Sequence, residues 1–148
     1  YADSFRFASN HVLLRSELTG IASRDLDKIH TALTVGNFYF SIDALASPKG
    51  FAAYMRGGGH DYLMGDSVGG SHKDLKLYVD LPPRAAQTFE VKLYRDGREI
   101  QTSRLKNTVW DIREPGFYRV YVRLRIQFPI PGELRWIPWI YTNNFYVK

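Results

Sequence analysis

The stretch that decides the fold is FYRVYVRLRIQF, residues 117–128. From Tyr118 to Phe128 every second residue is apolar or aromatic, and arginine, tyrosine and glutamine fill the positions between them. Successive side chains of a strand point to opposite faces, so one face is predicted to be buried and the other to meet solvent. The stretch therefore predicts a long antiparallel strand with one solvent-exposed face, bounded by turns at residues 114–116 and 129–132.

The same period of two continues outward from this strand. Leucine and valine alternate with polar residues over residues 75–81, and Phe89, Val91 and Leu93 repeat the pattern. Asp96-Gly97 predicts a β-hairpin with its return strand at residues 99–103, because a two-residue type I′ turn needs positive φ at both positions. Further strands are predicted at residues 37–42, 51–55, 108–112 and 136–148, and flexible glycine-rich loops at residues 57–59 and 65–70.

Short strands at this spacing, with turn signals between them, predict a mainly β fold. The expected architecture is an antiparallel, immunoglobulin-like two-sheet sandwich. A small closed barrel is the alternative, because the sequence does not fix closure. The side chains expected inside are Leu75, Leu77, Val79, Val91, Leu93, Tyr118, Val120, Val122 and Leu124.

One short helix is predicted at residues 23–36, ahead of most strands. Its apolar residues at helical spacing are Leu26, Ile29, Ala32 and Leu33. Ser23 is expected to cap the start, Asp25 and Asp27 place negative charge in the first turn, and Gly36 is expected to end the helix. A helix of about three turns persists only when it is packed, so we expect it to lie against the sandwich.

The predicted helix also suggests how the chain is organised. Residues 11–14 are apolar and are predicted to form a strand or a buried extended piece. We interpret residues 1–36 as an extended segment and helix that bridge from an upstream domain, and residues 37–148 as the sandwich.

Composition narrows the classes of function. The 148 residues include no cysteine, which excludes disulfides and thiolate metal sites. No apolar run approaches the roughly 18 residues that span a bilayer, so no transmembrane segment is predicted. The formal net charge of +5 agrees with an acidic partner.

The candidates for a metal site lie in the glycine-rich region. They are His60, Asp61, Asp66 and His72, with Asp74 nearby. Imidazole and carboxylate can bind a divalent ion, but the spacing matches no known ligand pattern. We therefore favour a polar loop and predict no metal site. His11 and His30 lie beside apolar positions and are predicted to be packed or surface histidines.

No catalytic residues are predicted in this chain. It has no Gly-x-Ser-x-Gly elbow, and spacing alone supports no Ser–His–Asp arrangement. The glycine runs are not followed by Lys-Ser/Thr, which argues against a phosphate loop. An enzyme within these residues is therefore the third of three hypotheses, after an accessory domain and a binding module.

A binding surface has better support. If the alternating strands share one sheet, its outer face carries Lys76, Tyr78, Lys92, Tyr94, Arg119, Tyr121, Arg123 and Arg125. Interleaved basic and aromatic side chains suit an anionic sugar, a phosphate-bearing ligand or single-stranded nucleic acid. An ordinary solvated sheet face is the alternative, and docking against a neighbouring domain is a further one. Of the tryptophans Trp110, Trp136 and Trp139, the last is predicted to be core or interdomain packing.

Several short motifs are spread over nearly the whole chain. They are Ser4-Phe5-Arg6, His11-Val12-Leu13-Leu14, Leu18-Thr19-Gly20, Ala32-Leu33, Gly36-Asn37-Phe38-Tyr39, Ser41-Ile42-Asp43, Gly50-Phe51, Met64-Gly65-Asp66, Leu93-Tyr94-Arg95-Asp96-Gly97, Glu114-Pro115-Gly116-Phe117-Tyr118-Arg119-Val120 and Pro138-Trp139-Ile140, with Asn143, Tyr146 and Val147. In order and spacing they resemble the carboxy-terminal part of bacterial proteins of the PHP (polymerase and histidinol phosphatase) metallohydrolase superfamily. The chain departs from that pattern at Asn144, where proline is expected.

The resemblance implies that the chain is the C-terminal part of a longer metal-dependent hydrolase. A (β/α) barrel ahead of Tyr1 would hold the divalent metals, and no cofactor is expected in this chain, which has no His-x-His or Asp-x-His motif. The expected function is that of a non-catalytic accessory domain in docking to this barrel or in substrate presentation. The alternative is an autonomous binding module for an acidic glycan or single-stranded nucleic acid.

Overall fold

The computed structural model describes residues 7–69, 74–83, 88–127 and 132–148. Its longest strand is β10 (Gly116–Gln127), which is paired along both edges. β7 (Thr88–Arg95) lies along one edge. Along the other edge, β12 (Phe145–Val147) pairs with the start of β10 and β11 (Leu134–Thr142) with its remainder. The long alternating strand is therefore central to its sheet.

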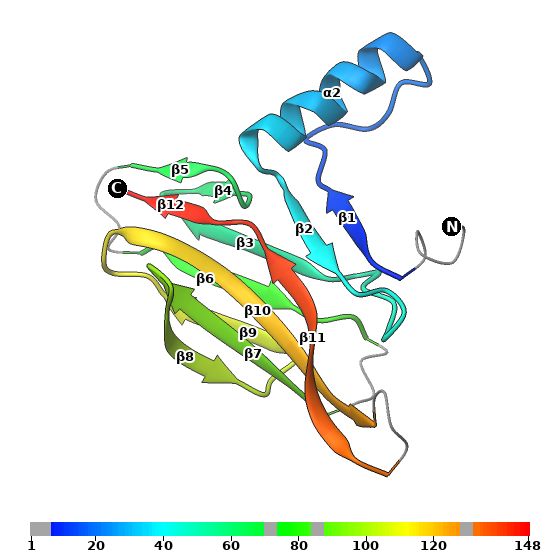
Figure 1. Ribbon diagram of the computed structural model, residues 1–148. Coiled ribbons are helices and arrows are strands. Elements are labelled where there is room, and N and C mark those ends of the chain that lie inside the picture. Colours follow the sequence, from blue (N-terminus) through cyan, green and yellow to red (C-terminus); the bar gives the residue numbers. More distant parts are fainter. Residues whose placement is uncertain (1–6, 70–73, 84–87, 128–131) are drawn as a thin grey trace.

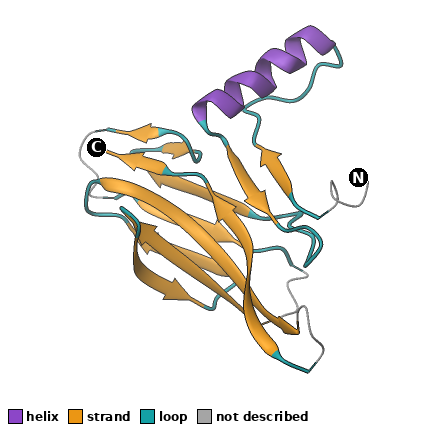
Figure 2. Ribbon diagram, in the orientation of Figure 1, coloured by secondary structure: helices purple, strands orange, loops and turns teal. Residues whose placement is uncertain are grey.

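Two sheets face each other (Figures 1 and 2). Sheet A has the order β1-β2-β11-β10-β12-β5, with β7 on the other edge of β10 and β8 beyond β7. Its remaining strands are β1 (Ser9–Val12), β2 (Phe38–Ser41), β5 (Ser67–Val68) and β8 (Arg98–Ser103). Sheet B has the order β4-β3-β6-β9, with β3 (Ala52–Gly57), β4 (His60–Tyr62), β6 (Lys76–Asp80) and β9 (Asn107–Asp111).

The mainly β, two-sheet prediction is confirmed, with two differences in detail. β5 and β12 pair in parallel, so sheet A is mixed rather than wholly antiparallel. β5 lies within the loop predicted at residues 65–70, and β4 lies between the two predicted glycine-rich loops. These strands are too short for a period of two to be recognised in the sequence.

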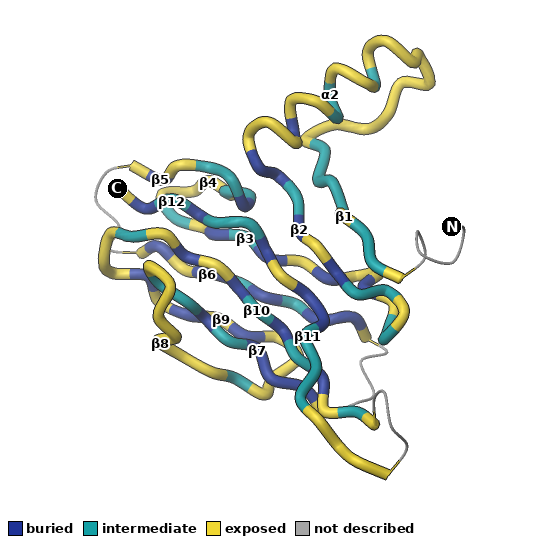
Figure 3. The backbone as a smooth tube through the Cα atoms, viewed as in Figure 1, coloured by how far each residue is buried: buried dark blue, intermediate teal, exposed yellow. Residues whose placement is uncertain are grey.

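The core lies between the two sheets, whose inward-facing residues are buried (Figure 3). All nine side chains that were expected inside are buried, which confirms the predicted register of β6, β7 and β10. Trp139 is also buried, and its indole N–H donates to the carbonyl oxygen of Ala46 at 2.9 Å. Trp139 therefore packs in the core, as predicted.

The hairpin between β7 and β8 turns at the two residues predicted. Asp96 has φ 50° and Gly97 has φ 82°, the left-handed values that a type I′ turn requires. Asp96 also accepts a hydrogen bond from the backbone N–H of Phe117, at 2.9 Å. This bond ties the turn to the start of β10.

Helix α2 (Ala22–Val35) ends as predicted but begins differently. Gly36 ends it with φ 95°. Ser23 lies inside the helix rather than at its N-cap, which is Ile21 and has no side-chain cap. Asp25 instead reaches back and accepts hydrogen bonds from the N–H groups of Thr19 and Gly20, both at 2.8 Å. The carboxylate thus holds the preceding loop against the first turn.

The expectation that this helix lies against the sandwich is wrong. It projects from the sheets, and Ala32 is its one buried residue (Figures 1 and 3). Leu26 is 52% exposed and Leu33 is 41% exposed. Helical spacing fixes which residues form a stripe but not what covers it. None of the helices in the described part of the chain has the length and apolar character to span a bilayer.

The predicted boundary at residue 36 falls within one hydrogen-bonded sheet. β1 pairs with β2 over four residue pairs, from Ser9 with Ser41 to Val12 with Phe38. Residues 9–12 therefore belong to sheet A, and α2 is an excursion between its first two strands.

The end of α2 is joined to two distant turns by hydrogen bonds. The Asn143 amide donates to the carbonyl oxygen of Gly36 at 3.1 Å, and the Gly65 N–H donates to the carbonyl oxygen of Asn144 at 2.6 Å. The Asn37 amide donates to the carbonyl oxygen of Met64 at 2.6 Å. The Asn144 N–H donates to the Asn143 side chain, a bond that the proline expected at this position could not make.

We predict that Gly65→Ala destabilises the protein. Gly65 has φ 90°, and an added Cβ would lie 2.5 Å from the carbonyl oxygen of Val35. We expect the free energy of unfolding to fall by about 1–3 kcal/mol in urea denaturation. Gly69→Ala is the control, because its added Cβ meets no atom within 4 Å. Equal losses in the two variants would contradict this account.

Candidate functional site

The structure separates the eight predicted binding residues into two groups. Six lie on β7 and β10, and the register places their side chains on the outer face of sheet A. These are Lys92, Tyr94, Arg119, Tyr121, Arg123 and Arg125. Lys76 and Tyr78 lie on β6 in sheet B, whose outer face is on the other side of the molecule. The alternation was predicted correctly, but the eight residues do not share a sheet.

A row of aromatic rings crosses the outer face of sheet A. Tyr141 pairs in register with Phe40 on one side and with Tyr121 on the other. The ring centroids are 6.2 Å apart for Phe40 and Tyr141, 4.8 Å for Tyr141 and Tyr121, and 6.3 Å for Tyr121 and Tyr94. Four neighbouring strands, β2, β11, β10 and β7, thus contribute one ring each.

Arg119 lies at the end of this row and lines a hollow of about 270 Å³ with Tyr94, Tyr121 and Tyr141. Its guanidinium is stacked over the Tyr94 ring, 5.5 Å from the centroid. Within the described ranges, no carboxylate lies within ion-pair distance of Arg119. The hollow therefore combines ring faces with a cation that is available to a ligand.

A second hollow, of about 330 Å³, adjoins the first across Arg119. It is lined by Asp96, Gly97, Phe117 and Asn144 as well as Arg119. Phe117 is exposed and makes an edge contact with Tyr146, with centroids 5.5 Å apart. Arg119 can therefore be reached from both sides.

The other two cations that β7 and β10 place on this face are bound to carboxylates. Arg123 donates to Glu90 at 2.6 and 2.9 Å, and its guanidinium also lies over the Trp136 ring at 4.6 Å. Lys92 donates to Glu99 at 2.6 Å. Glu90 is shared with Arg104, so this group keeps one positive charge. Of the four cations that β7 and β10 place on this face, Arg119 and Arg125 are the two that pair with no carboxylate among the described residues, and Arg125 is exposed.

Tyr121 remains a hydrogen-bond donor across the physiological range. Burial between its neighbours raises the pKa of the Tyr121 hydroxyl to about 12, and the adjacent Tyr141 adds to the shift. The hydroxyl is therefore protonated at neutral pH, and Tyr121 presents no competing negative charge to an anion bound at Arg119.

The outer face of sheet B has its own aromatic pair. Tyr54 and Tyr78 stack with centroids 5.2 Å apart, and Arg56 lies over both rings. Arg56 is also bound to Asp61 at 2.5 and 2.8 Å, and Lys76 pairs with Asp111 at 3.6 Å. The cations of this face are thus already occupied by carboxylates.

The metal candidates have other partners. Asp61 binds Arg56, and His60 is its exposed neighbour on β4. Asp66 binds Arg15 at 2.5 and 2.6 Å and accepts the N–H of Leu63 at 2.8 Å. His72 lies outside the described residues. In the parts of the chain that the structure describes, no three His, Asp or Glu side chains gather as metal ligands.

The structure brings together a serine, a histidine and an aspartate that spacing did not connect. Ser41 Oγ lies 2.9 Å from Nε2 of His11, and Asp43 lies 3.2 Å from the same nitrogen. Nucleophilic catalysis requires the carboxylate on the opposite ring nitrogen, so that Nε2 is free to accept the serine proton. Ser41 is fully buried and also donates to Asp43. The cluster therefore ties β1 to the turn after β2.

Asp43 is held ionised by this cluster. Burial alone would raise its pKa, but hydrogen bonds from Ser41, His11 and Ser9 outweigh it, and the pKa lies below its ordinary value. The Tyr39 ring stacks on His11 with centroids 4.7 Å apart. His11 is therefore a packed histidine, as predicted from its apolar neighbours.

Sequence reasoning missed Phe40 and Tyr141. Both lie in segments that were predicted as strands, but their place beside Tyr121 depends on the pairing of β10 with β11 and of β11 with β2. Comparison with family models, with curated proteins and with solved structures found no match.

We predict that Glu90→Gln weakens the folded state most at neutral pH. Burial would raise the pKa of Glu90, but Arg104 and Arg123 lower it below its ordinary value. This stabilisation is present above the unfolded pKa of about 4.3 and is lost as the pH falls through the lower folded pKa. We expect a loss of about 1–3 kcal/mol at pH 7 that shrinks as the pH falls below the unfolded pKa of about 4.3, measured by urea denaturation across pH.

The control for this prediction is Glu133→Gln. Glu133 pairs with Arg135 at the surface, where both side chains are more than half exposed. Its removal should cost less than about 1 kcal/mol, because exposed ion pairs contribute little. A Glu90→Gln variant whose loss of stability does not change with pH would contradict the assignment.

Proposed function

We propose that the chain is a non-catalytic accessory domain whose sheet A face binds an acidic glycan. We further propose that it is an immunoglobulin-like sandwich from a longer metal-dependent hydrolase of the PHP type, a parentage that rests on the sequence motifs alone. The observation that carries the binding role is the hollow in which Arg119, unpaired among the described residues, meets three tyrosine rings.

The lining of the hollow suits a sugar that carries a carboxylate. A sugar ring presents C–H groups on its face, which pack against aromatic rings, and hydroxyls at its edge, which the tyrosine hydroxyls can bind. A guanidinium binds a carboxylate through paired hydrogen bonds. Tyr94, Tyr121 and Tyr141 supply the first kind of contact and Arg119 the second.

Single-stranded nucleic acid fits this face less well. Binding along a phosphodiester backbone needs a series of available cations. Of the four cations that β7 and β10 place on this face, Lys92 and Arg123 are bound to Glu99 and Glu90, which leaves Arg119 and Arg125 without an ion pair among the described residues. The row also offers one hollow rather than a series of stacking sites along a strand of bases.

The binding role is tested with an oligogalacturonate, an oligomer of uronic acid. We expect the protein to bind it at low salt and the affinity to fall as salt is raised, because the contact is charged. Arg119→Ala should weaken binding about tenfold or more, as expected for the loss of one charge-assisted contact. Calorimetric titration measures both effects.

Arg125→Ala is the matched control, because Arg125 is an exposed arginine on the same face of β10 but outside the hollow. Its affinity should stay close to that of the unaltered protein. The methyl-esterified oligomer, which keeps the rings and lacks the charge, should bind weakly to all three proteins. Equal losses in the two arginine variants would contradict the proposal, as would tighter binding of a thymidine oligonucleotide.

Docking through α2 is a second proposed role, and the exposed stripe on this helix favours it. Leu26 and Leu33 are spaced seven residues apart, and Leu18 and Ile21 in the preceding segment are also exposed. A short amphipathic helix gains stability when its apolar stripe is covered. The proposed occupant is the catalytic barrel of the same longer protein.

We expect the paired change Leu26→Glu and Leu33→Glu to abolish association with that barrel, produced separately and mixed with this domain. The control is Thr31→Glu, an exposed position on the opposite side of the same helix from the two leucines. Analytical ultracentrifugation measures the association. Retained association in the leucine variant would rule out α2 as the docking element and leave the glycan proposal untouched.

A further inference from the structure

β9 is an edge strand of sheet B, and one of its edges is unpaired among the described residues. Its partner in the described part of the chain is β6, in register from Lys76 with Asp111 to Asp80 with Asn107. An unpaired strand edge presents backbone N–H and C=O groups that can pair with another chain.

The hydrogen bonds at the two ends of the β6–β9 ladder show which backbone groups face outward. The Leu81 N–H donates to the carbonyl oxygen of Lys106 at 2.9 Å, and the Ile112 N–H donates to that of Leu75 at 2.9 Å. In an antiparallel pair, alternate residues direct both groups toward the partner strand. Residues 106, 108, 110 and 112 therefore face β6, and Asn107, Val109 and Asp111 direct theirs to the unpaired edge.

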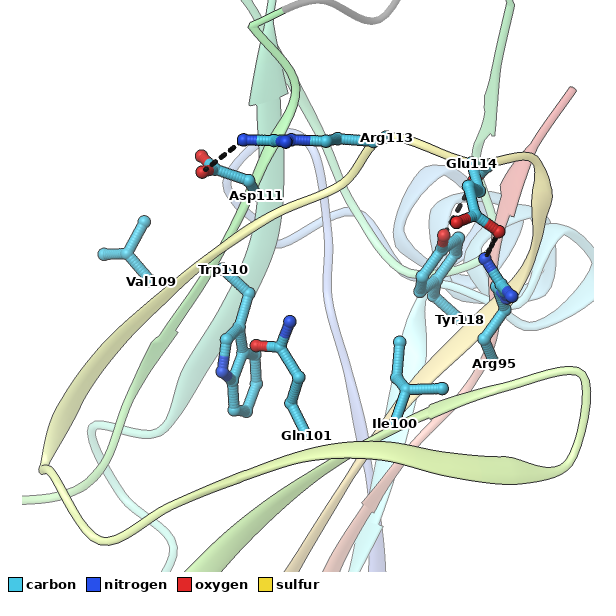
Figure 4. A pocket seen from close by; sticks show the side chains of 9 residues that line it. All are labelled: Arg95, Ile100, Gln101, Val109, Trp110, Asp111, Arg113, Glu114 and Tyr118. Carbon is cyan, nitrogen blue, oxygen red and sulfur yellow. Dashed lines mark hydrogen bonds and ion pairs between the residues drawn. The ribbon is translucent and has the colours of Figure 1, made fainter.

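A cleft of about 540 Å³ lies beside this edge, between β9 and β8 (Figure 4). Ile100 and Gln101 line it from β8 and Trp110 from β9, and Val109 borders it with its side chain on the outer face of sheet B. Ile100 is 41% exposed and Val109 is 49% exposed, although both are apolar. The volume lies within the range of roughly 300–1,000 Å³ that is typical of ligand sites.

Ion pairs border the cleft at the end away from the β8–β9 connection (Figure 4). Arg95 binds Glu114, and Arg113 lies 3.7 Å from Asp111. Glu114 and Arg113 are mostly exposed, so their charges also remain accessible to a bound chain.

We propose that the unpaired edge of β9 binds an extended peptide segment of a partner protein, which becomes the fifth strand of sheet B. The outward backbone N–H and C=O groups of β9 recur at every second residue. An extended peptide presents its own backbone groups at the same interval and can pair with them. Sheet A already extends to β8 on this side, so the added strand lies under β8 rather than in open solvent.

The chemistry of the cleft defines the peptide further. Side chains of the added strand that point inward meet Trp110 and Ile100, so alternate residues are apolar. Those that point outward lie beside Val109 and Asp111 and are polar. This is the pattern of β6 itself, in which Leu77 and Val79 face inward and Lys76 and Asp80 face outward. A copy of β6 is therefore a rational first probe.

The test uses a fluorescein-labelled peptide with the sequence LKLYVDL, that of residues 75–81, and fluorescence anisotropy. Two N-methylated forms are compared, one blocked at its third and fifth residues and one at its second, fourth and sixth. Because alternate N–H groups of an added strand face β9, one form should bind about tenfold or more weakly than the unmodified peptide. The other form should bind as the unmodified peptide does.

Hydrogen exchange followed by NMR locates the contact. In the free protein the amides of Val109 and Asp111 should exchange rapidly, whereas that of Ile112 is protected by Leu75. The peptide should slow exchange at Val109 and Asp111 by about tenfold or more and leave Ile112 unchanged.

Variants separate backbone pairing from filling of the cleft. Val109→Pro removes an outward N–H that β6 does not use, so the fold should persist and peptide binding should be lost. Gln101→Trp fills the cleft and should also abolish binding. Thr102→Trp is the control for it, because Thr102 is the next residue of β8 and does not line the cleft.

Three outcomes would overturn the proposal. One is equal binding of the two N-methylated peptides, which would mean that the cleft binds side chains rather than a paired backbone. Another is unchanged exchange at Val109 and Asp111 with saturating peptide. The third is the absence of peptide binding. None of these results bears on glycan binding at Arg119, which lies on the outer face of sheet A.

Discussion

The pairing of β10 along both of its edges is the constraint on which the rest of the structure depends. β7 pairs with it from Tyr118 to Arg125, and β11 and β12 share its other edge. A shift of one residue in this strand would move Val120, Val122 and Leu124 from the core to solvent. Because three strands are in register with β10, the same shift would misplace their inward residues too. The core and the aromatic row on the outer face are therefore set by one register.

The residues that could be predicted from the sequence are those whose position depends on local chemistry. The alternation of residues 117–128 predicted both faces of β10, and Asp96-Gly97 predicted a turn with two positive φ values. Alternation cannot say which sheet a strand joins. Tyr78 and Tyr94 have the same pattern of neighbours, yet one strand pairs with β3 and the other with β10. The candidate face was consequently predicted with two residues that belong elsewhere and without Phe40 and Tyr141.

The sequence also could not predict what covers the stripe on helix α2 or which charged residues are available to a ligand. Leu26 and Leu33 form a stripe because of their spacing, but the structure leaves them uncovered, since spacing carries no information about a partner. The net charge of +5 likewise does not locate available cations. Lys92 and Arg123 meet carboxylates that lie on neighbouring positions of β7 and β8, while Arg119 meets an aromatic ring. Only tertiary pairing separates an arginine that is bound to a carboxylate from one that can bind a ligand.

The two proposed binding sites use different parts of the same strands. Tyr94 and Arg95 are consecutive on β7, so Tyr94 points to the hollow at Arg119 and Arg95 to the cleft beside β9. On β8 a bulge has the same effect, because the register with β7 shifts between Leu93 and Tyr94. Glu99 accepts hydrogen bonds from Lys92 and Tyr94 on the outer face, and Gln101 faces the cleft. One site uses side chains on a sheet face, and the other uses backbone groups at a sheet edge. A sandwich can hold both because the alternation that buries its core also directs neighbouring residues to opposite surfaces.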